Sequence, residues 1–378
     1  MTADSRKKTG GPGPVVKPGI MEIAPYQGGK ARIAGRERAI KLSANEGALG
    51  PSPKAMAAFA AAAPDLHRYP DGSSRILRSA ISRFSGLDMK RIVCGAGSDE
   101  LLLLLMRAYA GLGDEVLYSA HGFLIYPIFA HSVGATPVKA EETNLTASVD
   151  ALLAKVTART RIVFLANPNN PTGSYLPTGE LRRLRAGLPD HVLLVLDSAY
   201  AEYVDRDDYT AGADLVDENS NVVMTRTFSK IFGLGAMRLG WCYAPAPIVD
   251  VLNRLRPPFN TTTPGQLAGA AAMDDRDHLR RSQDHNTTWR EYLGEALTGM
   301  GFRVFPSVAN FVLVEFGAGV TEAADRAEAA LLRDGLIPRW VDHYGLRGCL
   351  RITIGQEAEM RAVVAALSRL VKDGSHVG

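Results

Sequence analysis

Lys230 is the residue of this sequence best placed for covalent chemistry. It follows Asn221 to Met224, a short apolar stretch that predicts a buried strand, and it precedes a glycine-rich segment over 233–240. A lysine amine that is partly desolvated or close to another cation becomes a nucleophile and forms Schiff bases with aldehydes and ketones. Arg238 lies 238 − 230 = 8 residues on, and it could supply both that cation and a clamp for a phosphate. The alternative is an exposed lysine before a turn, the usual setting of a lysine.

A candidate anion site lies where a predicted strand, 91–94, runs into a predicted helix, 101–110. The connection contains Gly97, Ser98 and Asp99. Backbone N–H groups at the start of a helix are unpaired, and together with the helix dipole they bind anions such as phosphate. The third glycine of a dinucleotide-binding fingerprint is missing here, which argues against that motif. A helix cap without a ligand explains the stretch equally well.

Three further predicted strands are followed by side chains suited to holding a planar ligand. These strands cover 115–118, 161–166 and 192–196. Phe123 could stack on a ring, although Phe123 and Tyr126 could equally belong to the core. Asn167 offers an amide donor. Asp197 would be costly to bury unless it met a cation or a donor, and a protonated pyridine nitrogen is one such partner.

The elements that position these residues alternate between strand and helix patterns from Pro51 to about residue 255. Alternation of this kind is typical of crossover units and a mainly parallel sheet, in which ligands bind at the carboxyl ends of the strands. A chain of 378 residues is also longer than one hydrophobic core usually organises. We therefore predict an α/β fold with a large domain, built on a mainly parallel sheet flanked by helices, and a smaller α+β C-terminal domain.

The predicted boundary between these domains is Pro257-Pro258, because the proline pair ends a helix predicted over 248–256. The first 20 residues are rich in glycine, proline and lysine and lack a pattern that could form a core. The predicted units are a mobile tail (1–20), an N-terminal arm packing across the active site (21–50), the large domain (51–257) and the small domain (258–372).

The composition excludes several classes of function. A net charge of +3 is too small to indicate nucleic acid or a membrane surface as a partner. The three cysteines have no spacing typical of zinc sites or disulfide frameworks, so we predict no metal site and a reducing compartment. A signal peptide pattern is absent, and no apolar run approaches the length that spans a bilayer. These observations predict a cytoplasmic protein.

The candidate residues and their neighbours form a series of motifs that resembles the fold type I pyridoxal-phosphate aminotransferases, and most closely the histidinol-phosphate aminotransferases. The resemblance extends from about Met21 to Leu370. Its motifs, in family order, are Pro25-Tyr26, Leu42 to Glu46, Arg68 to Asp71, Asn167 to Gly173, Asp197 with Tyr200, Ser229-Lys230, Arg238, and Leu350 to Gly355. The sequence departs from many relatives at Gly47-Ala48-Leu49 and by having Phe123 in place of a tyrosine. Neither departure removes a group that does chemistry.

The resemblance implies pyridoxal 5'-phosphate as cofactor and an aspartate-aminotransferase-like fold. Lys230 would bind the cofactor as a Schiff base and later carry the proton, and Asp197 would pair with the pyridine nitrogen. Asn167 and Tyr200 would hydrogen-bond the ring oxygen, and Phe123 would stack on the ring. The residues implied around the phosphate are Gly97, Ser98, Asp99, Ser229 and Arg238.

Arg351 carries a planar guanidinium that suits a carboxylate, so it is the candidate clamp for the substrate's α-carboxylate, with a surface ion pair as the alternative. Arg339 would meet the distal anion of the substrate, and Tyr26 and Asn45 would complete the substrate site. The resemblance also implies a homodimer in which Tyr69 reaches the neighbouring subunit's cofactor phosphate.

The predicted function is ping-pong amino transfer between histidinol phosphate and 2-oxoglutarate or glutamate, as in histidine biosynthesis. Its alternative within the family is an aromatic amino-acid aminotransferase acting on phenylalanine or tyrosine, or a broad enzyme doing both. Outside the family, a nucleotide-dependent dehydrogenase would leave Lys230 unexplained and lacks the third glycine. A non-catalytic regulator would normally carry a DNA-binding module, for which the tail is too short.

Overall fold

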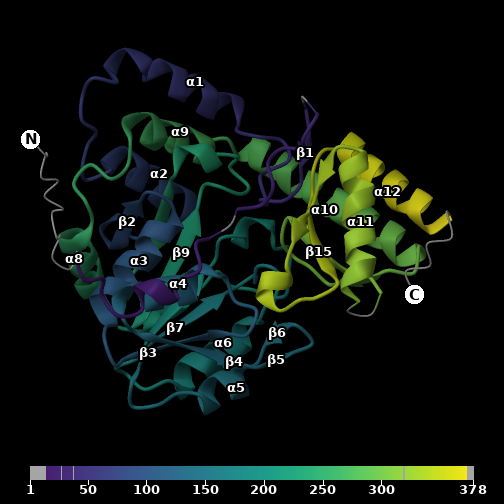
Figure 1. Ribbon diagram of the computed structural model, residues 1–378. Coiled ribbons are helices and arrows are strands. Elements are labelled where there is room, and N and C mark those ends of the chain that lie inside the picture. The colour runs from purple at the N-terminus through teal and green to yellow at the C-terminus, as the bar shows by residue number, and fades with distance from the viewer. Residues whose placement is uncertain (1–13, 27, 37, 318–319, 373–378) are drawn as a thin grey trace, which may run out of the picture.

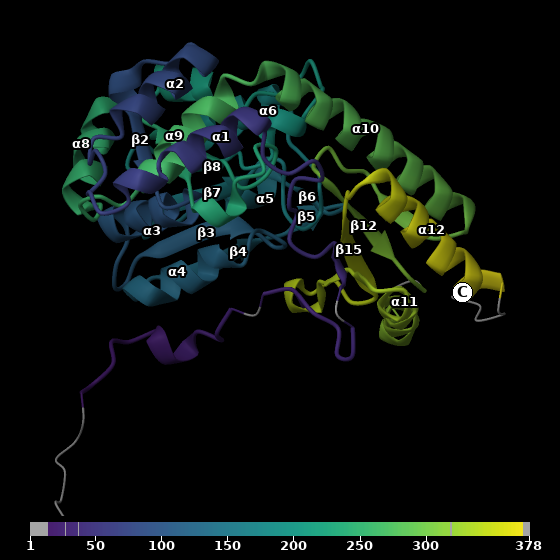
Figure 2. The same ribbon diagram turned by 90° about the horizontal axis from the view of Figure 1, so that it is seen from above.

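The computed structural model describes residues 14–26, 28–36, 38–317 and 320–372. Two β-sheets organise two parts of the chain, which lie side by side in both views (Figures 1 and 2). We call these the large sheet and the small sheet. Most of the predicted mobile tail, residues 1–13, lies outside the described residues. No helix within the described ranges is both long and apolar enough to cross a membrane.

The large sheet has the strand order β2-β10-β9-β8-β7-β3-β4. Its strands are β2 (Ile92–Gly95), β3 (Glu115–Ser119), β4 (Thr136–Ala140), β7 (Thr160–Ala166), β8 (Leu193–Asp197), β9 (Val222–Thr227) and β10 (Gly240–Tyr243). Neighbouring strands are parallel except at β10, which runs antiparallel to both β2 and β9. The prediction of a mainly parallel sheet is therefore confirmed.

Helices cover both faces of the large sheet, as its apolar strands require. They are α1 (Pro53–Ala61), α2 (Arg75–Ser85), α3 (Ser98–Tyr109), α4 (Ile125–Val133), α5 (Val149–Ala154), α6 (Thr178–Gly187), α7 (Ala213–Glu218), α8 (Ala246–Leu255) and α9 (Thr263–Met273). Alternate residues of β7 show the two faces. Val163 and Leu165 pack with α2, α5, α6, α7 and α9, whereas Ile162 and Phe164 pack with α3, α4 and α8.

The small sheet is antiparallel, in the order β11-β12-β15-β14. Its strands are β11 (Arg303–Phe305), β12 (Phe311–Glu315), β14 (Arg339–Trp340) and β15 (Cys349–Thr353), and the helices around it are α10 (Arg276–Gly299), α11 (Thr321–Arg333) and α12 (Glu357–Lys372). Leu350 and Ile352 of β15 pack in the core formed with these helices. Because side chains alternate along a strand, Arg351 points from the opposite face.

Shorter elements complete the chain. The two-stranded pairings are β1 (Ile40–Lys41) with β13 (Leu336–Ile337), and β5 (Glu142–Thr143) with β6 (Thr146–Ala147). The 3-10 helices are η1 (Ile20–Glu22), η2 (Ala63–Asp65), η3 (Met89–Arg91), η4 (Ala201–Tyr203), η5 (Gly235–Met237) and η6 (Asp342–Tyr344). The pairing of β1 with β13 attaches the N-terminal segment to the small sheet's side of the molecule.

The boundary between the large and small domains at Pro257-Pro258 remains a prediction. In the structure α9 follows these prolines and packs against α1 and α2, beside the large sheet. The next helix, α10, contacts α12, β11 and β12, and it also contacts η4 and α9 beside the large sheet. These contacts favour a division near the start of α10.

Candidate active site

The edge of the large sheet at which its parallel strands end faces the small sheet across a cavity of about 330 Å³. Asp197 ends β8, Lys230 follows β9, and Arg351 reaches the cavity from β15. The structure thus brings together residues that are far apart in the sequence. The predicted site residues that line this cavity are Tyr26, Asn45, Ser98, Asp99, Phe123, Asp197, Tyr200, Ser229, Lys230, Arg238, Arg339 and Arg351.

Lys230 is part-buried, and its ammonium group donates to the carbonyl oxygen of Ala44 at 3.1 Å. The ring of Tyr200 lies 5.6 Å from Lys230 Nζ. Burial, and then the positive charge of Arg351, lower the pKa of Lys230 from 10.5 to about 8. The uncharged amine, which is the state that attacks a carbonyl group, is therefore far more populated near neutral pH than in an ordinary lysine.

Asp197 is a buried carboxylate held by two hydroxyl donors. Tyr126 donates to Asp197 Oδ2 at 2.9 Å and Thr225 to Oδ1 at 3.3 Å. Burial raises the pKa of Asp197 from 3.8 to about 6, against the lowering effect of these hydrogen bonds and of Lys230. The carboxylate therefore favours a cationic partner within the cavity.

Tyr126, which the sequence alone could equally place in the core, hydrogen-bonds a predicted site residue. It is fully buried, and its ring stacks on Phe164 at a centroid distance of 4.8 Å and meets Phe123 edge-on at 6.0 Å. Tyr126 thus contacts both the predicted ring-stacking residue and the predicted partner of the pyridine nitrogen. The signal in the sequence was its hydroxyl group, since a buried tyrosine usually finds a hydrogen-bond partner.

The predicted anion cradle forms where β2, α3 and the segment before β10 meet. Gly97 is the N-cap of α3 with φ of 87°, and no side chain caps the helix. The Arg238 guanidinium lies 3.4 Å from both Asp99 Oδ2 and Ser229 Oγ. The positive φ of Gly97 favours glycine, and a Cβ there would lie 2.6 Å from Arg238 Nη2, so a larger residue would also displace the guanidinium. Gly97 itself does not line the cavity, whereas Ser98 and Asp99 do.

Arg351 and Arg339 lie directly opposite each other on the antiparallel strands β15 and β14, and both are buried. Arg351 donates to Asn170 Oδ1 and, at 2.7 Å, to the carbonyl oxygen of Ser43. Its buried Nε has no hydrogen-bond partner among the described residues. Like charges opposite each other destabilise a sheet, so this pair is suited to anionic ligands such as carboxylates and phosphates.

Asn167 is not brought into the cavity, in contrast to the prediction. Its side-chain amide donates to the carbonyl of Leu176 at 3.1 Å and accepts from the N–H of Leu176 at 2.7 Å. Both the oxygen and the nitrogen of the Asn167 amide are therefore hydrogen-bonded to the backbone of Leu176. Asn170 of the same motif lines the cavity and contacts Arg351. Of the two asparagines, the structure therefore places Asn170, and not Asn167, on the wall of the cavity.

The remaining predicted residues differ in their settings. Asn45 is buried with φ of 56°, and its amide donates to the Tyr200 hydroxyl at 2.9 Å. Tyr69 is 83% exposed and stacks on Phe259 at 4.8 Å, away from the cavity of its own chain.

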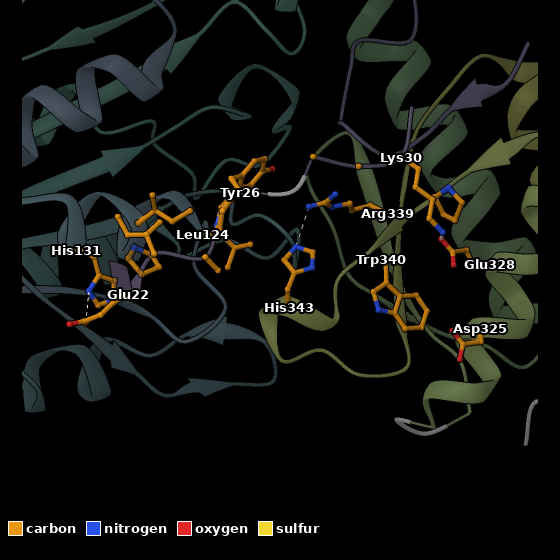
Figure 3. A pocket seen from close by; sticks show the side chains of 18 residues that line it. Glu22, Tyr26, Lys30, Leu124, His131, Asp325, Glu328, Arg339, Trp340 and His343 are labelled. Atoms are coloured by element: carbon orange, nitrogen blue, oxygen red, sulfur yellow. Dashed lines mark hydrogen bonds and ion pairs between the residues drawn. The ribbon is translucent and has the colours of Figure 1, made fainter. Parts of the chain in front are cut away.

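A second, outer cavity of about 790 Å³ adjoins the first and shares Tyr26, Gly28, Gly29 and Arg339 with it. Its apolar lining includes Leu124 and Trp340 (Figure 3). His343, also in its wall, was not singled out from the sequence.

Three comparisons place this geometry among known proteins. An aspartate aminotransferase of Thermus thermophilus solved with maleate shares the fold, with a TM-score of 0.76 and 20% identity over 88% of this chain and 92% of that one. The histidinol-phosphate aminotransferase of Sinorhizobium meliloti, solved in complex with pyridoxal-5'-phosphate, gives a TM-score of 0.87 and 29% identity over 99% of both chains. A relative named histidinol-phosphate aminotransferase, from Paramagnetospirillum magneticum, is 56% identical over 95% of this chain and 99% of its own length.

The fold is therefore that of the aspartate-aminotransferase-like, pyridoxal-phosphate-dependent transferases. A family model described as aminotransferase class I and II matches residues 37–367. The chain belongs to the class I and II aminotransferases.

The hydrogen bond from Tyr126 to Asp197 predicts a pH-dependent loss of stability in Tyr126→Phe. Above pH 6 Asp197 is ionised in both the folded and the unfolded apoprotein, so the folded state bears the cost of burying the charge. As pH falls through about 6, the folded carboxyl takes up a proton that the unfolded one, with a pKa of 3.8, does not, and stability rises. Removing the Tyr126 donor should cost about 1.5–3 kcal/mol at pH 8 and less at pH 5.

Thermal unfolding of the apoprotein at pH 8 and pH 5 measures this difference. Tyr118→Phe is the matched control, because Tyr118 is also buried and its ring lies 6.2 Å from that of Tyr126, but it does not contact Asp197. An equal loss for Tyr126→Phe at both pH values would contradict the assignment.

Proposed function

We propose that this protein is a pyridoxal-phosphate-dependent aminotransferase that transfers an amino group between histidinol phosphate and 2-oxoglutarate or glutamate, as in histidine biosynthesis. The observation that carries the proposal is one cavity in which Lys230 and Asp197 face the buried pair Arg339 and Arg351. The names of relatives at over half identity support the same substrate. The predicted cytoplasmic location remains a prediction.

The residues present fit the cofactor. Lys230 would hold it covalently, Asp197 would meet its ring nitrogen, and Phe123 lines the cavity as the candidate for stacking. For the ring oxygen we keep Tyr200 and replace Asn167 by Asn170. The cradle around Gly97, which a Cβ would fill, fits a phosphate, with Ser98, Asp99, Ser229 and Arg238 around it. When bound, the cofactor supplies an electron-withdrawing ring that stabilises negative charge at the substrate's α-carbon.

The protein's own residues would then bind, orient and move a proton. Arg351 would hold the α-carboxylate through its guanidinium fork, which fixes the direction of the α-carbon. The Lys230 amine, with its pKa lowered to about 8, would accept the proton from the α-carbon in one half of the reaction. In the other half it would return a proton to the α-carbon of the second substrate. The carbonyl of Ala44, 3.1 Å from Lys230 Nζ, would orient the amine.

An aromatic amino-acid aminotransferase, or a broad enzyme doing both, is the second candidate. The apolar wall of the outer cavity, which includes Leu124, Ile128 and Trp340, favours it because an aromatic ring would be accommodated there. Glutamate, phenylalanine and tyrosine each bring an α-carboxylate to Arg351, whereas histidinol phosphate carries a phosphate ester in place of that carboxylate. The two functions therefore differ at Arg339, since only histidinol phosphate brings a doubly charged group that reaches it.

We also propose a homodimer in which Tyr69 reaches the neighbouring subunit's cofactor phosphate. In a single chain Tyr69 stacks on Phe259, which is 45% exposed, and nearby Leu66 is 67% exposed. A cluster of large exposed apolar side chains of this kind is typical of a surface that a protein covers.

Lys230→Ala should abolish amino transfer while leaving the fold intact. Borohydride reduction of the yellow cofactor-loaded protein should fix the cofactor to Lys230, detected by mass spectrometry of the peptide. Lys41→Ala is the control, because Lys41 lines the same cavity but pairs with Glu46 at 2.8 Å. Modification of another lysine, or wild-type turnover in Lys230→Ala, would refute the assignment.

The substrate is tested by the ratio of kcat/KM for histidinol phosphate to that for phenylalanine, with 2-oxoglutarate as acceptor. We expect a ratio above one, which Arg339→Ala lowers by about tenfold or more, since the loss of a charge-assisted partner penalises the phosphate most. A wild-type ratio below one would favour the aromatic alternative. Equal losses on both substrates would remove Arg339 from the substrate site.

Hybrid dimers test the shared active site. Lys230→Ala and a Tyr69→Ala variant, each with little activity alone, should regain part of the activity when mixed, because one of the two sites in a hybrid is then intact. Homodimers of each variant, incubated alone under the same conditions, are the control. A strictly monomeric protein, or no recovery, would count against the dimer.

A further inference from the structure

His343 stands beside the arginine to which we assign the distal anion of the substrate. It belongs to η6, which follows β14, the strand that carries Arg339. His343 Nε2 lies 3.2 Å from Arg339 Nη2, and both residues line the outer cavity (Figure 3). A guanidinium group can only donate hydrogen bonds, so Nε2 is the acceptor and the imidazole is neutral in this arrangement.

The surrounding charges explain why the imidazole is neutral. Burial, and then the positive charges of Arg339 and Arg351, lower the pKa of His343, while Asp342 acts in the opposite direction. Elsewhere in the cavity wall Lys30 forms an ion pair with Glu328 at 2.8 Å, and His131 Nδ1 lies 3.3 Å from the Glu22 carboxylate. Asp325 is the remaining carboxylate in this wall, and Tyr26, Tyr200 and Tyr344 are phenols close enough to the arginines to interact with them.

A doubly charged anion at Arg339 would reverse this balance. A phosphate monoester has its second pKa near 6 and carries close to two negative charges at pH 8. Once Arg339 donates to such a group, Nε2 is released from its acceptor role, and the nearby negative charge raises the imidazole pKa. The ring then takes a proton from solvent and donates to a phosphate oxygen. A carboxylate carries one charge and an aromatic ring carries none, so neither drives this protonation as strongly.

We propose that His343 is a second ligand for the substrate's phosphate group beside Arg339, and that it selects phosphate monoesters over carboxylates and uncharged rings by taking up a proton when the dianion binds. The proposal rests on the assignment of that group to Arg339 in the proposed function. It adds a specificity residue that changes its protonation state and leaves the chemistry at Lys230 untouched.

The test uses the cofactor-loaded enzyme and propyl phosphate, which has no amino group and cannot react. Inhibition constants against histidinol phosphate are measured between pH 6.5 and 9 for wild type, His343→Gln and His131→Gln. Calorimetric titrations at pH 8, in two buffers of different ionisation enthalpy, count the protons taken up on binding. His131 is the matched control, since it lines the same cavity and pairs with Glu22 instead of Arg339.

Wild type and His131→Gln should each take up a fraction of a proton per molecule of propyl phosphate bound. Their affinity for propyl phosphate should fall as the pH rises towards 9. His343→Gln should take up none and bind the inhibitor about tenfold more weakly at pH 7, the range expected for a charge-assisted hydrogen bond. Its kcat/KM for glutamate should stay within about twofold of wild type, because α-carboxylate binding at Arg351 is unchanged.

The outcomes separate this inference from the proposed function. If propyl phosphate does not compete with histidinol phosphate, or if Arg339→Ala binds it as wild type does, the assignment of the phosphate to Arg339 fails. If Arg339→Ala loses binding while His343→Gln keeps both affinity and proton uptake, the role of His343 alone is wrong. An equal loss on glutamate and propyl phosphate in His343→Gln would reduce His343 to a structural support.

Discussion

The structure depends on holding four charged side chains largely away from water in one place. Lys230 and Asp197 come from the large sheet, and Arg339 and Arg351 from the small sheet. A buried charge costs several kcal/mol unless it is paired or hydrogen-bonded. The pKa of Asp197 is raised and the pKa of Lys230 is lowered because burial makes the charged form of each group less favourable. A ligand with complementary charges at both ends would offset the cost of burying these groups. The burial of unpaired charges therefore favours the binding of a charged ligand such as an amino acid or a phosphate-bearing cofactor.

Strand direction explains why these groups meet at all. Parallel strands deliver their carboxyl ends to one edge, where β8 ends in Asp197 and β9 leads into Lys230. The antiparallel β10 begins at the same edge, two residues after Arg238. Close packing there depends on glycine. A Cβ on Gly240 would lie 2.4 Å from the backbone nitrogen of Ser98, so a larger residue would displace the start of α3 and with it the anion cradle.

Much of this was predictable from the sequence because the signals are local. Apolar runs predict the strands to within a few residues, and the polar residues after these runs predict several of the residues that line the cavity. The features that the sequence could not predict are those that need tertiary contacts. Nothing local distinguishes Asn167 from Asn170, since the difference is that Leu176 occupies the amide of Asn167. Tyr126 has the same helical setting as a core residue until Asp197 is placed 2.9 Å from its hydroxyl. The packing of α9 on α1 and α2 joins segments about 200 residues apart, beyond the reach of any local pattern.

The arm explains how the two halves of the site act together. Three consecutive residues of it each contact a different functional side chain. The Ser43 carbonyl accepts from Arg351, the Ala44 carbonyl accepts from Lys230, and the Asn45 amide donates to Tyr200. The arm is fixed to the small sheet's side through β1 and through the bond from the Asn45 backbone N–H to Thr353 Oγ1 at 3.0 Å. Any shift of the small sheet that moves Arg351 towards a carboxylate therefore also moves the carbonyl that holds the Lys230 amine. In the proposed function, the arm would therefore connect the binding of a carboxylate at Arg351 with the position of the Lys230 amine, through the neighbouring carbonyls of Ser43 and Ala44.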